Sequence, residues 1–386
     1  MKKITVVHAQ SVIAYPPVIS LIENLLNNGS KATLISYDID LLPTYIQTNS
    51  NFRGIQIPKI SGNFVGKVRN SFKRSRFVKA AVKKSMVDSD LLWTTTDLSV
   101  RVLGDDVLKY KHVMQLMELI KWYPDNFYLK KIAKLGIFRY PLDKYARKAW
   151  KVVVPEENRA YIQQLWWNLP DKPQVLPNKP YELENSLSQN NTPSLNAAIN
   201  KMKKEKRKIV LYLGILSPER GLASFARAIN NLGKEYCLYI IGKPINDSYL
   251  QKIKYLTKKY NNVIYLGYYP APLHLLFLRF AHIGLLPYQP SKPSVEFISE
   301  LNALYCAPNK IFEYAGYGLP MLGTNVPGIE YPIRKYGIGA TVNHITDQEI
   351  VFGINLIEKN YEVLSKNCLK YYNDVDLDNI VNKIIN

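Results

Sequence analysis

The chain has 386 residues, which is enough for two domains of ordinary size. Apolar residues make up 47% and charged residues 21%, and this balance excludes a wholly disordered chain. Lys and Arg (51) outnumber Asp and Glu (31), so the net charge of +20 favours an anionic partner: nucleic acid, an anionic membrane surface or a phosphorylated substrate. The three cysteines are too few for a disulfide framework or a zinc cluster.

The first half of the chain alternates short apolar strands with helical segments. The apolar run 4–7 follows Lys2 and Lys3 as in a signal peptide, but it stops at His8, so a buried first strand is the better interpretation. Further strands are expected at 32–36, 90–93, 112–116, 151–154 and 174–176, and a helix at 18–26. Strands that alternate with helices predict a parallel, doubly wound sheet.

A polar stretch separates this half from a second one with the same rhythm. Residues 181–206 are rich in Ser, Asn and Gln and end in a basic run, which is typical of a linker. Strands follow at 209–213, 237–241, 263–266, 283–286 and 320–323, with helices at 222–232, 309–316 and over most of the last forty residues. The sequence therefore predicts an α/β protein with two doubly wound, Rossmann-like domains, 1–180 and 207–365, on either side of a cleft.

Glycines stand at the ends of several strands predicted in the second domain. Gly214, Gly242 and Gly267 occupy the carboxyl ends, where parallel α/β domains bind ligands, and a glycine lets backbone approach a ligand closely. A tight turn is the more ordinary explanation for any one of them. Ser217 and Arg220 follow at a helix start that would suit a phosphate, although Ser217 also fits a helix N-cap followed by proline.

The most informative segment is P-N-K-I-F-E-Y at 308–314. Asn309 would cap a helix with Lys310 in its first turn, and Glu313 lies three residues later on the same face. A cation for phosphate and a carboxylate for vicinal ribose hydroxyls would suit a nucleoside diphosphate. From spacing alone, a capped helix with a local Lys/Glu pair explains the pattern better.

This segment closely resembles the nucleotide-sugar site of GT-B glycosyltransferases, in particular bacterial enzymes similar to family 4. The resemblance covers nearly the whole chain, because further similar segments occur in the same order as in that family. They are 144–159, 176–178, Gly214 with 220–221, 262–270, 283–288 and 325–329. It implies a GT-B architecture, in which residues 366–386 form a C-terminal helix that packs back on the first domain.

The resemblance also implies roles for individual residues. Glu313 would hold the donor ribose, Arg220 and Lys310 the diphosphate, and the segment around Tyr268 the base. The full expected donor-binding set is Gly214, Ser217, Arg220, Gly242, Lys243, Tyr268, Tyr288, Tyr305, Asn309, Lys310, Glu313 and Thr324. Two positions depart from the family pattern. Tyr305 stands where the first Glu of its E-x7-E pair contacts the donor sugar, and Ile215 replaces a loop arginine.

The first domain is expected to face the acceptor. Glu118 follows a strand in a turn that resembles the family's H-[DE] turn, with Met117 in the histidine position. A positioned carboxylate such as Glu118 could act as general base for an acceptor hydroxyl, and a solvated loop carboxylate is an equally good interpretation. Asp97 follows another strand and is a second catalytic candidate, or a helix N-cap.

No metal or other cofactor is expected, apart from the nucleoside-diphosphate sugar as substrate. Asp38 and Asp40 spell D-x-D, the motif of the unrelated GT-A fold, but no other ligand is near them in the sequence and a turn explains them better. The five histidines are dispersed.

The stretch 59–84 contains nine basic residues and no acidic one, with an imperfect apolar stripe at helical spacing. This pattern suits an anionic membrane surface, and solvated helix faces are the alternative. The expected membrane-binding residues are Lys67, Arg69, Lys73, Arg74, Arg76, Lys79, Lys83 and Lys84, and a second basic stretch runs over 130–151. Nucleic acid is a weaker candidate, because the sequence contains no base-reading module.

These observations predict a metal-independent glycosyltransferase in the cytoplasm, peripheral to the inner face of the cell membrane. It would move a sugar from a nucleoside-diphosphate sugar to a lipid-linked or growing glycan acceptor, most naturally in bacterial surface polysaccharide assembly such as capsule formation. The alternative is a catalytically inactive GT-B subunit that stabilises another transferase.

Overall fold

The computed structural model describes residues 1–59, 64–121, 142–181, 192–290 and 298–386, without the side chains of 64–71. The chain divides into two compact units. Unit 1 comprises Met1–Tyr181, Lys292–Asn302 and Asp376–Asn386, and unit 2 comprises Glu182–Ser291 and Ala303–Val375. Two segments from the second half of the sequence thus belong to the first unit.

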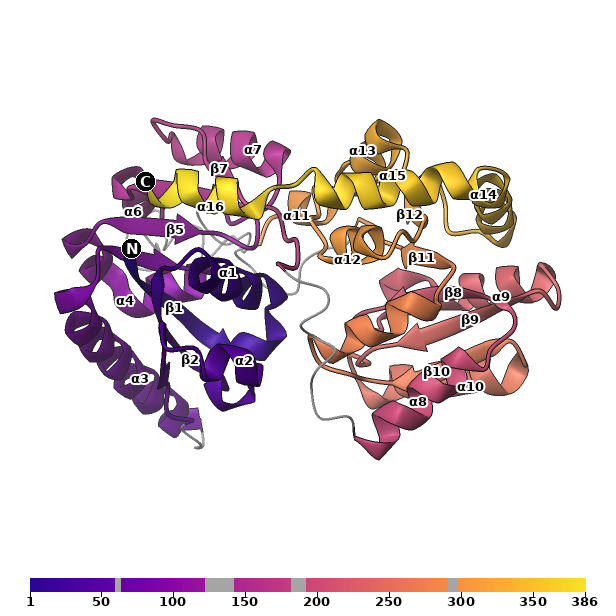
Figure 1. Cartoon of the computed structure of the whole chain (residues 1–386), viewed down its shortest axis with the longest axis horizontal. Coiled ribbons are helices and arrows are strands. Elements are labelled where there is room, and N and C mark those ends of the chain that lie inside the picture. Colours follow the sequence, from indigo (N-terminus) through magenta and orange to yellow (C-terminus); the bar gives the residue numbers. More distant parts are fainter. Residues whose placement is uncertain (60–63, 122–141, 182–191, 291–297) are drawn as a thin grey trace. The chain divides into compact units, whose positions relative to one another are not determined.

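Unit 1 is built on a parallel sheet, of which Figure 1 labels β1, β2, β5 and β7. Its strand order is β3-β2-β1-β4-β5-β6-β7. Its strands are β1 (Lys3–Ser11), β2 (Lys31–Tyr37), β3 (Phe52–Gln56), β4 (Leu91–Thr94), β5 (His112–Gln115), β6 (Lys151–Val154) and β7 (Gln174–Val175). Its helices are α1 (Pro16–Asn27), α2 (Thr44–Gln47), α3 (Phe64–Ser85), α4 (Asp97–Leu103), α6 (Leu142–Lys148), α7 (Glu157–Trp167) and α16 (Leu377–Ile385). The central strands are buried on both faces, as their continuous apolar runs require.

Unit 2 repeats the plan with strand order β10-β9-β8-β11-β12-β13. Its strands are β8 (Lys208–Leu213), β9 (Tyr236–Ile241), β10 (Val263–Gly267), β11 (Ile283–Leu286), β12 (Met321–Thr324) and β13 (Gly339–Val342). Its helices are α8 (Pro193–Lys203), α9 (Leu222–Asn231), α10 (Asp247–Lys259), α12 (Lys310–Gly316), α13 (Pro327–Tyr336), α14 (Asp347–Lys359) and α15 (Tyr361–Asn373), and the short α11 (Leu301–Leu304) spans the boundary between the units. The predicted α/β class with two doubly wound sheets is confirmed.

The linker prediction was wrong over α8. Residues 193–203 form a helix, although their composition is polar, because Leu195, Ala198 and Met202 recur at helical spacing and pack in the core of unit 2. The Thr192 side chain caps this helix by accepting a hydrogen bond from the backbone N–H of Leu195. Residues 182–191 of the predicted linker lie outside the described residues.

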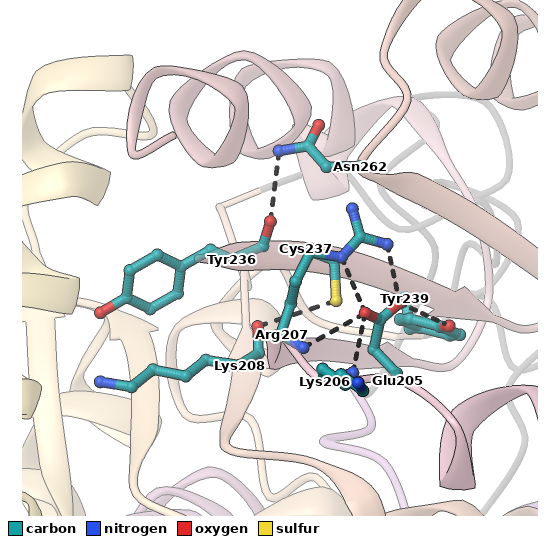
Figure 2. Close-up of polar contacts among 8 residues, drawn as sticks. All are labelled: Glu205, Lys206, Arg207, Lys208, Tyr236, Cys237, Tyr239 and Asn262. Atoms are coloured by element: carbon teal, nitrogen blue, oxygen red, sulfur yellow. Dashed lines mark hydrogen bonds and ion pairs between the residues drawn. The ribbon is translucent and has the colours of Figure 1, made fainter. Parts of the chain in front are cut away.

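A polar clasp, formed by Glu205, Arg207 and Tyr239, lies at the amino ends of β8 and β9 (Figure 2). The Glu205 carboxylate accepts from Arg207 Nε at 2.8 Å and from Arg207 Nη2 at 2.7 Å, and from the Tyr239 hydroxyl at 3.2 Å. These hydrogen bonds outweigh partial burial and lower the pKa of Glu205 to about 2. The clasp therefore fixes the chain as it enters the sheet, at the edge opposite the carboxyl ends of the strands.

The last helix of the chain belongs to unit 1. α16 packs against α1, with Asn24 Nδ2 donating to Asp378 at 2.6 Å and Lys2 Nζ donating to the carbonyl oxygen of Ile385 at 2.8 Å. Its apolar face is buried: Val381 is 2% exposed and Ile384 is 0% exposed. α15, directly before it in the sequence, packs on α12 of unit 2, where the rings of Phe312 and Tyr371 stack.

Candidate functional site

The strand order of unit 2 reverses between β8 and β11. β8 leads to β9 and β10 in one direction, and its other neighbour β11 leads to β12 and β13 in the opposite direction. Doubly wound sheets bind ligands beyond the carboxyl ends of the strands at this switch point. Gly214 follows β8 and Tyr288 lies two residues after β11, so both are at the position where a ligand is expected.

α12 brings Lys310 and Glu313 to this edge because Tyr314 anchors the helix on the sheet. Tyr314 is fully buried, its hydroxyl accepts from the backbone N–H of Leu213, and its ring packs against Gly284 of β11 so closely that a Cβ there would lie 2.5 Å from it. Glycine at position 284 is therefore required for α12 to sit on β11.

Lys310 lies across the end of β8. A Cβ added to Gly214 would lie 2.7 Å from Lys310 Cε and 3.0 Å from Nζ, and Gly214 has φ of +136°, a conformation that favours glycine. Within the described part of the chain no ion pair joins Lys310 to Glu313. The local Lys/Glu pair that spacing alone favoured is therefore not formed, and the ammonium group faces the strand end.

Arg220 supplies a second cation at the same edge. Its guanidinium group lies 4.2 Å from the centroid of the Tyr288 ring, and the Tyr288 carbonyl accepts a hydrogen bond from the hydroxyl of Thr324 at the end of β12. Burial raises the pKa of Tyr212 on β8, and the charges of Arg220 and Lys310 both oppose that rise. The charges of both cations therefore act on Tyr212, and two cations at the end of one strand suit a diphosphate.

Glu313 combines deep burial with ionisation. The residue is 3% exposed, and one of its oxygens lies 3.2 Å from Nε2 of His274, on the 3₁₀ helix Leu273–Phe280. Burial alone would raise the pKa of Glu313, but the charge and hydrogen bond of His274 and the charge of Lys310 outweigh it, so the pKa lies below the ordinary value of 4.5. His274 was not predicted as a site residue from the sequence, because a lone histidine in an apolar segment belongs to no motif.

Several expected donor residues have structural roles that the sequence did not predict. Asn309 occupies the N-cap position of α12 in a helical conformation, and its side chain caps nothing. Ser217 is buried and its hydroxyl donates to Glu219 at 2.5 Å instead of capping a helix. Gly242 is close to backbone: a Cβ there would lie 1.7 Å from the carbonyl oxygen of Gly214.

The remaining expected donor residues are less closely connected to the cations. Lys243 is exposed beside the Gly214 loop, and its carbonyl accepts from the backbone N–H of Leu216. Tyr268 follows β10 and is 55% exposed, and Tyr305 follows α11 and is partly buried.

Unit 1 has its own switch point, between β1 and β4, and both candidate catalytic carboxylates lie near one tyrosine there. Burial raises the pKa of Tyr15, the Gln10 amide opposes the rise, and the charges of Glu118 and Asp97 add to it. The Tyr15 ring also packs edge-on against buried His8, with 4.6 Å between centroids. Tyr15 and His8 were not predicted as site residues.

The two carboxylates are held differently. Asp97 is the first residue of α4 and forms an ion pair with Arg101 at 3.1 Å; the N-cap is Thr96, so the N-cap interpretation of Asp97 was wrong. Glu118 is exposed and accepts from Asn302 Nδ2 at 2.5 Å. Buried Arg159 donates to the carbonyl oxygens of Met117 and Asn302, and so ties the Glu118 turn to the segment at 298–302.

No metal centre or membrane span is formed by the residues that the structure describes. They contain no group of three His, Cys, Asp or Glu side chains that could hold an ion. Asp38, from the D-x-D motif, has a left-handed backbone and forms an ion pair with Lys59. None of the helices described has the length and hydrophobicity needed to cross a bilayer.

The expected membrane-binding residues lie on α3, but its apolar stripe faces inward. Val78 and Val82 are 0% and 1% exposed in the core of unit 1, so this part of the stripe is not available to a membrane. Lys79 forms an ion pair with Asp106 at 3.5 Å, and Arg74 is partly buried. The exposed members are Lys73, Arg76, Lys83 and Lys84, beside Phe72, which is 68% exposed.

Parts of the membrane prediction cannot be placed. The side chains of Lys67 and Arg69 lie outside the described residues, as does most of the second basic stretch.

Comparison with known proteins now gives these sites a context. Residues 207–353 match the family model described as glycosyl transferases group 1. Over these residues the second unit is similar to group 1 glycosyltransferases. The match includes Gly214, Arg220, Lys310 and Glu313, so the cations and the buried carboxylate lie within the segment that resembles this family. A search of curated proteins found no match.

Solved structures with little sequence identity share the fold of the whole chain. HepE of Anabaena, in complex with UDP and glucose, is 12% identical with a TM-score of 0.67, over 100% of this chain and 98% of that one. Sucrose-phosphate synthase of Thermosynechococcus elongatus is 17% identical with a TM-score of 0.65, over 100% and 97%. A trehalose-6-phosphate protein of E. coli bound with UDP-2-fluoro glucose is 12% identical with a TM-score of 0.61, over 99% and 98%. The fold is GT-B, and glycosyl transfer is the activity class that fold and family model support.

Proposed function

We propose that this glycosyltransferase moves a sugar from a nucleoside-diphosphate sugar to a lipid-linked or growing glycan acceptor. The observation that carries the proposal is the separation of Lys310 from Glu313 on α12: the cation lies over Gly214 and the carboxylate is buried beside His274. Because Lys310 forms no ion pair with Glu313 in the described part of the chain, its ammonium group is available to a diphosphate. The ionised, buried carboxylate of Glu313 suits the vicinal hydroxyls of a ribose.

The proposed roles of the charged residues follow from where charge develops during sugar transfer. When the bond from the sugar to the diphosphate breaks, negative charge grows on the leaving oxygen, and Arg220 and Lys310 would stabilise it. In unit 1, Glu118 would accept the proton of the acceptor hydroxyl. With two cations at the diphosphate, we propose that transfer needs no metal ion, so turnover should survive EDTA.

A uridine donor is the first to test, because HepE and the E. coli protein were solved with UDP or a UDP sugar. A thermal-shift screen with UDP, GDP, CMP and their sugars should give a rise in Tm for the true donor, since a ligand that binds only the folded state stabilises it. A rise with none of them would contradict the proposal. A donor that binds without any sugar release, with or without acceptors, would favour the inactive-subunit alternative, which Tyr305 in place of the family's Glu also supports.

The nucleotide site has a direct test in Glu313→Ala. Losing charge-assisted hydrogen bonds to the ribose should weaken binding of the selected nucleoside diphosphate at least about tenfold. A 2′,3′-dideoxy ligand should bind wild type less tightly and lose little more in the variant, and this non-additivity identifies direct contact. Calorimetric titration of the four combinations decides between direct contact and a general loss of structure, which would give additive losses.

We also propose that unit 1 attaches to the inner face of the cell membrane through the exposed basic residues of α3. Four of them, Lys73, Arg76, Lys83 and Lys84, have no ion-pair partner in the described part of the chain. Phe72 beside them offers an apolar side chain for the headgroup region. An enzyme attached in this way would meet a lipid-linked acceptor of surface polysaccharide assembly.

A further inference from the structure

His274 is held in place by the apolar residues that follow it. Leu275, Leu276, Phe277 and Leu278 are all buried, from 0% to 7% exposed, so the 3₁₀ helix is fixed in the core of unit 2. The imidazole is therefore presented to α12 from a rigid support. In the described part of the chain, His274 is the only side chain that pairs with the Glu313 carboxylate.

One hydrogen bond from His274 leaves most of the carboxylate's capacity unused. An ionised carboxylate has about four lone-pair sites, and His274 occupies one of them on a single oxygen. Glu313 is nevertheless only 3% exposed, so donors from a ligand would stabilise this carboxylate more than they would an exposed one. The pair thus combines a fixed orientation with remaining sites for two hydroxyl groups.

A second His–Glu pair in the same unit shows what a purely structural pair looks like. His282 Nε2 lies 2.8 Å from Glu358, but Lys208 Nζ also contacts that carboxylate at 2.6 Å, so both oxygens are used. That pair lies at the amino ends of β8 and β11, opposite the ligand edge. Lys310, in contrast, faces Gly214 and leaves the Glu313 carboxylate to His274 alone among the described residues.

We propose that His274 is a positioning residue of the nucleotide site, which holds one oxygen of Glu313 so that the carboxylate meets the 2′ and 3′ hydroxyls of the donor ribose. This inference rests on the proposed function, because it assumes that a nucleoside diphosphate occupies the site. It assigns no contact between His274 and the ligand.

The test measures calorimetric Kd values for UDP and 2′,3′-dideoxy-UDP, or the GDP pair if the screen selects guanosine. His274→Ala should weaken UDP about threefold to tenfold, the range expected for one hydrogen bond, and leave the dideoxy ligand within about twofold. His274→Gln places an amide donor at similar reach and should restore most of the discrimination between the two ligands. His282→Ala is the matched control: it removes the other pair and should lower Tm without changing the ratio of the two Kd values.

The outcomes separate this inference from the proposed function. Equal weakening of both ligands by His274→Ala would overturn the positioning role and leave the nucleotide site standing. His274→Gln retains a donor and serves if the alanine variant does not fold. If its two Kd values for UDP and 2′,3′-dideoxy-UDP differ no more than those of Glu313→Ala, the positioning role is likewise overturned. Wild-type protein that binds no nucleotide at all would overturn the proposed function and this inference together.

Discussion

Glu118 is exposed, yet its position is fixed by the amide of Asn302 and by the neighbouring turn that Arg159 holds. An exposed carboxylate on a loop is usually free to move, so this support is what a general base requires. Burial raises the pKa of Tyr15, and the charges of Glu118 and Asp97 both add to that rise, so the two carboxylates act on the same tyrosine.

We expect Glu118→Gln to lower turnover of the donor by about 10²-fold or more, because general-base catalysis contributes that much and glutamine keeps the size without the charge. The Kd of the donor should change little, which is the pattern of an interaction made mainly in the transition state. Release of nucleoside diphosphate measures the first quantity and calorimetry the second. Asp88→Asn, an exposed acid before β4 at the opposite edge of the same sheet, should leave both unchanged.

Among individual residues, the sequence predicted the site residues that belong to a motif. It missed those that only the fold places next to the site. Arg220, Lys310 and Glu313 were found through their resemblance to a family, whereas spacing alone favoured a Lys/Glu pair that does not form. His274 lies 39 residues before Glu313 and reaches it only because the 3₁₀ helix packs beside α12. The Asn309 cap failed because the residue adopts helical dihedrals.

Among the elements, α3 shows how one pattern can serve two purposes. Its valines at 78 and 82 bury one face in unit 1, and that packing accounts for apolar residues that also resembled a membrane stripe. Periodicity indicates an amphipathic helix, but it does not indicate which surface the apolar face meets. The basic face remains exposed at Lys73, Arg76, Lys83 and Lys84.

Reversing charge on that face tests the membrane proposal. Lys73→Glu, Arg76→Glu, Lys83→Glu and Lys84→Glu together should abolish cosedimentation with anionic liposomes at low salt, since each basic residue near such a surface contributes about 1 kcal/mol. Nucleotide binding should be retained, because α3 belongs to unit 1. A matched set on unit 2 (Lys252, Lys254, Lys258 and Lys259 of α10, each to Glu) should leave cosedimentation unchanged. Equal loss in both sets would point to net charge alone and contradict a specific face.

The polar clasp of unit 2 should make its stability depend on pH. The pKa of Glu205 is about 2 in the folded chain and ordinary when unfolded, so the ionised clasp stabilises fully above pH 4.5. That contribution is lost as pH falls from about 4.5 towards about 2. We expect Glu205→Gln to lower the free energy of unfolding by about 1–3 kcal/mol at pH 6 and by much less at pH 3. Urea unfolding at both pH values measures the difference, and Glu330→Gln, in an exposed i,i+4 pair, serves as control.

At the scale of the whole molecule, neither of the two units is a single continuous stretch of the sequence. Alternating strands predicted two doubly wound domains and a boundary near residue 180, where the structure divides at Tyr181. Local patterns gave no sign that residues 298–302 pair with the Glu118 turn, because such a contact depends on long-range packing. The short strands β3 and β13 were also not predicted from the sequence, since each has few apolar residues.

The packing of α16 on α1 predicts a destabilisation confined to unit 1. Ile384 is 0% exposed, so Ile384→Ala should cost about 2–5 kcal/mol. Hydrogen exchange should show loss of protection in β1 and α1, with β8 and β9 as protected as in wild type. Lys383→Ala changes an exposed residue of the same helix and should leave both units unaffected. Equal loss in both units would contradict the assignment of α16 to unit 1 alone.

The return of the chain to unit 1 has a consequence for its synthesis. A ribosome completes α15, the last element of unit 2, before it makes α16, so every part of the second unit exists while the first still lacks its final helix. Domains usually fold from the amino terminus as they emerge. Here the amino-terminal unit must wait until α16 has been made, and until then the apolar face of α1 lacks the helix that covers it. A chaperone that binds nascent chains should therefore hold this protein through its first unit, and release it only after α16 has emerged from the ribosome.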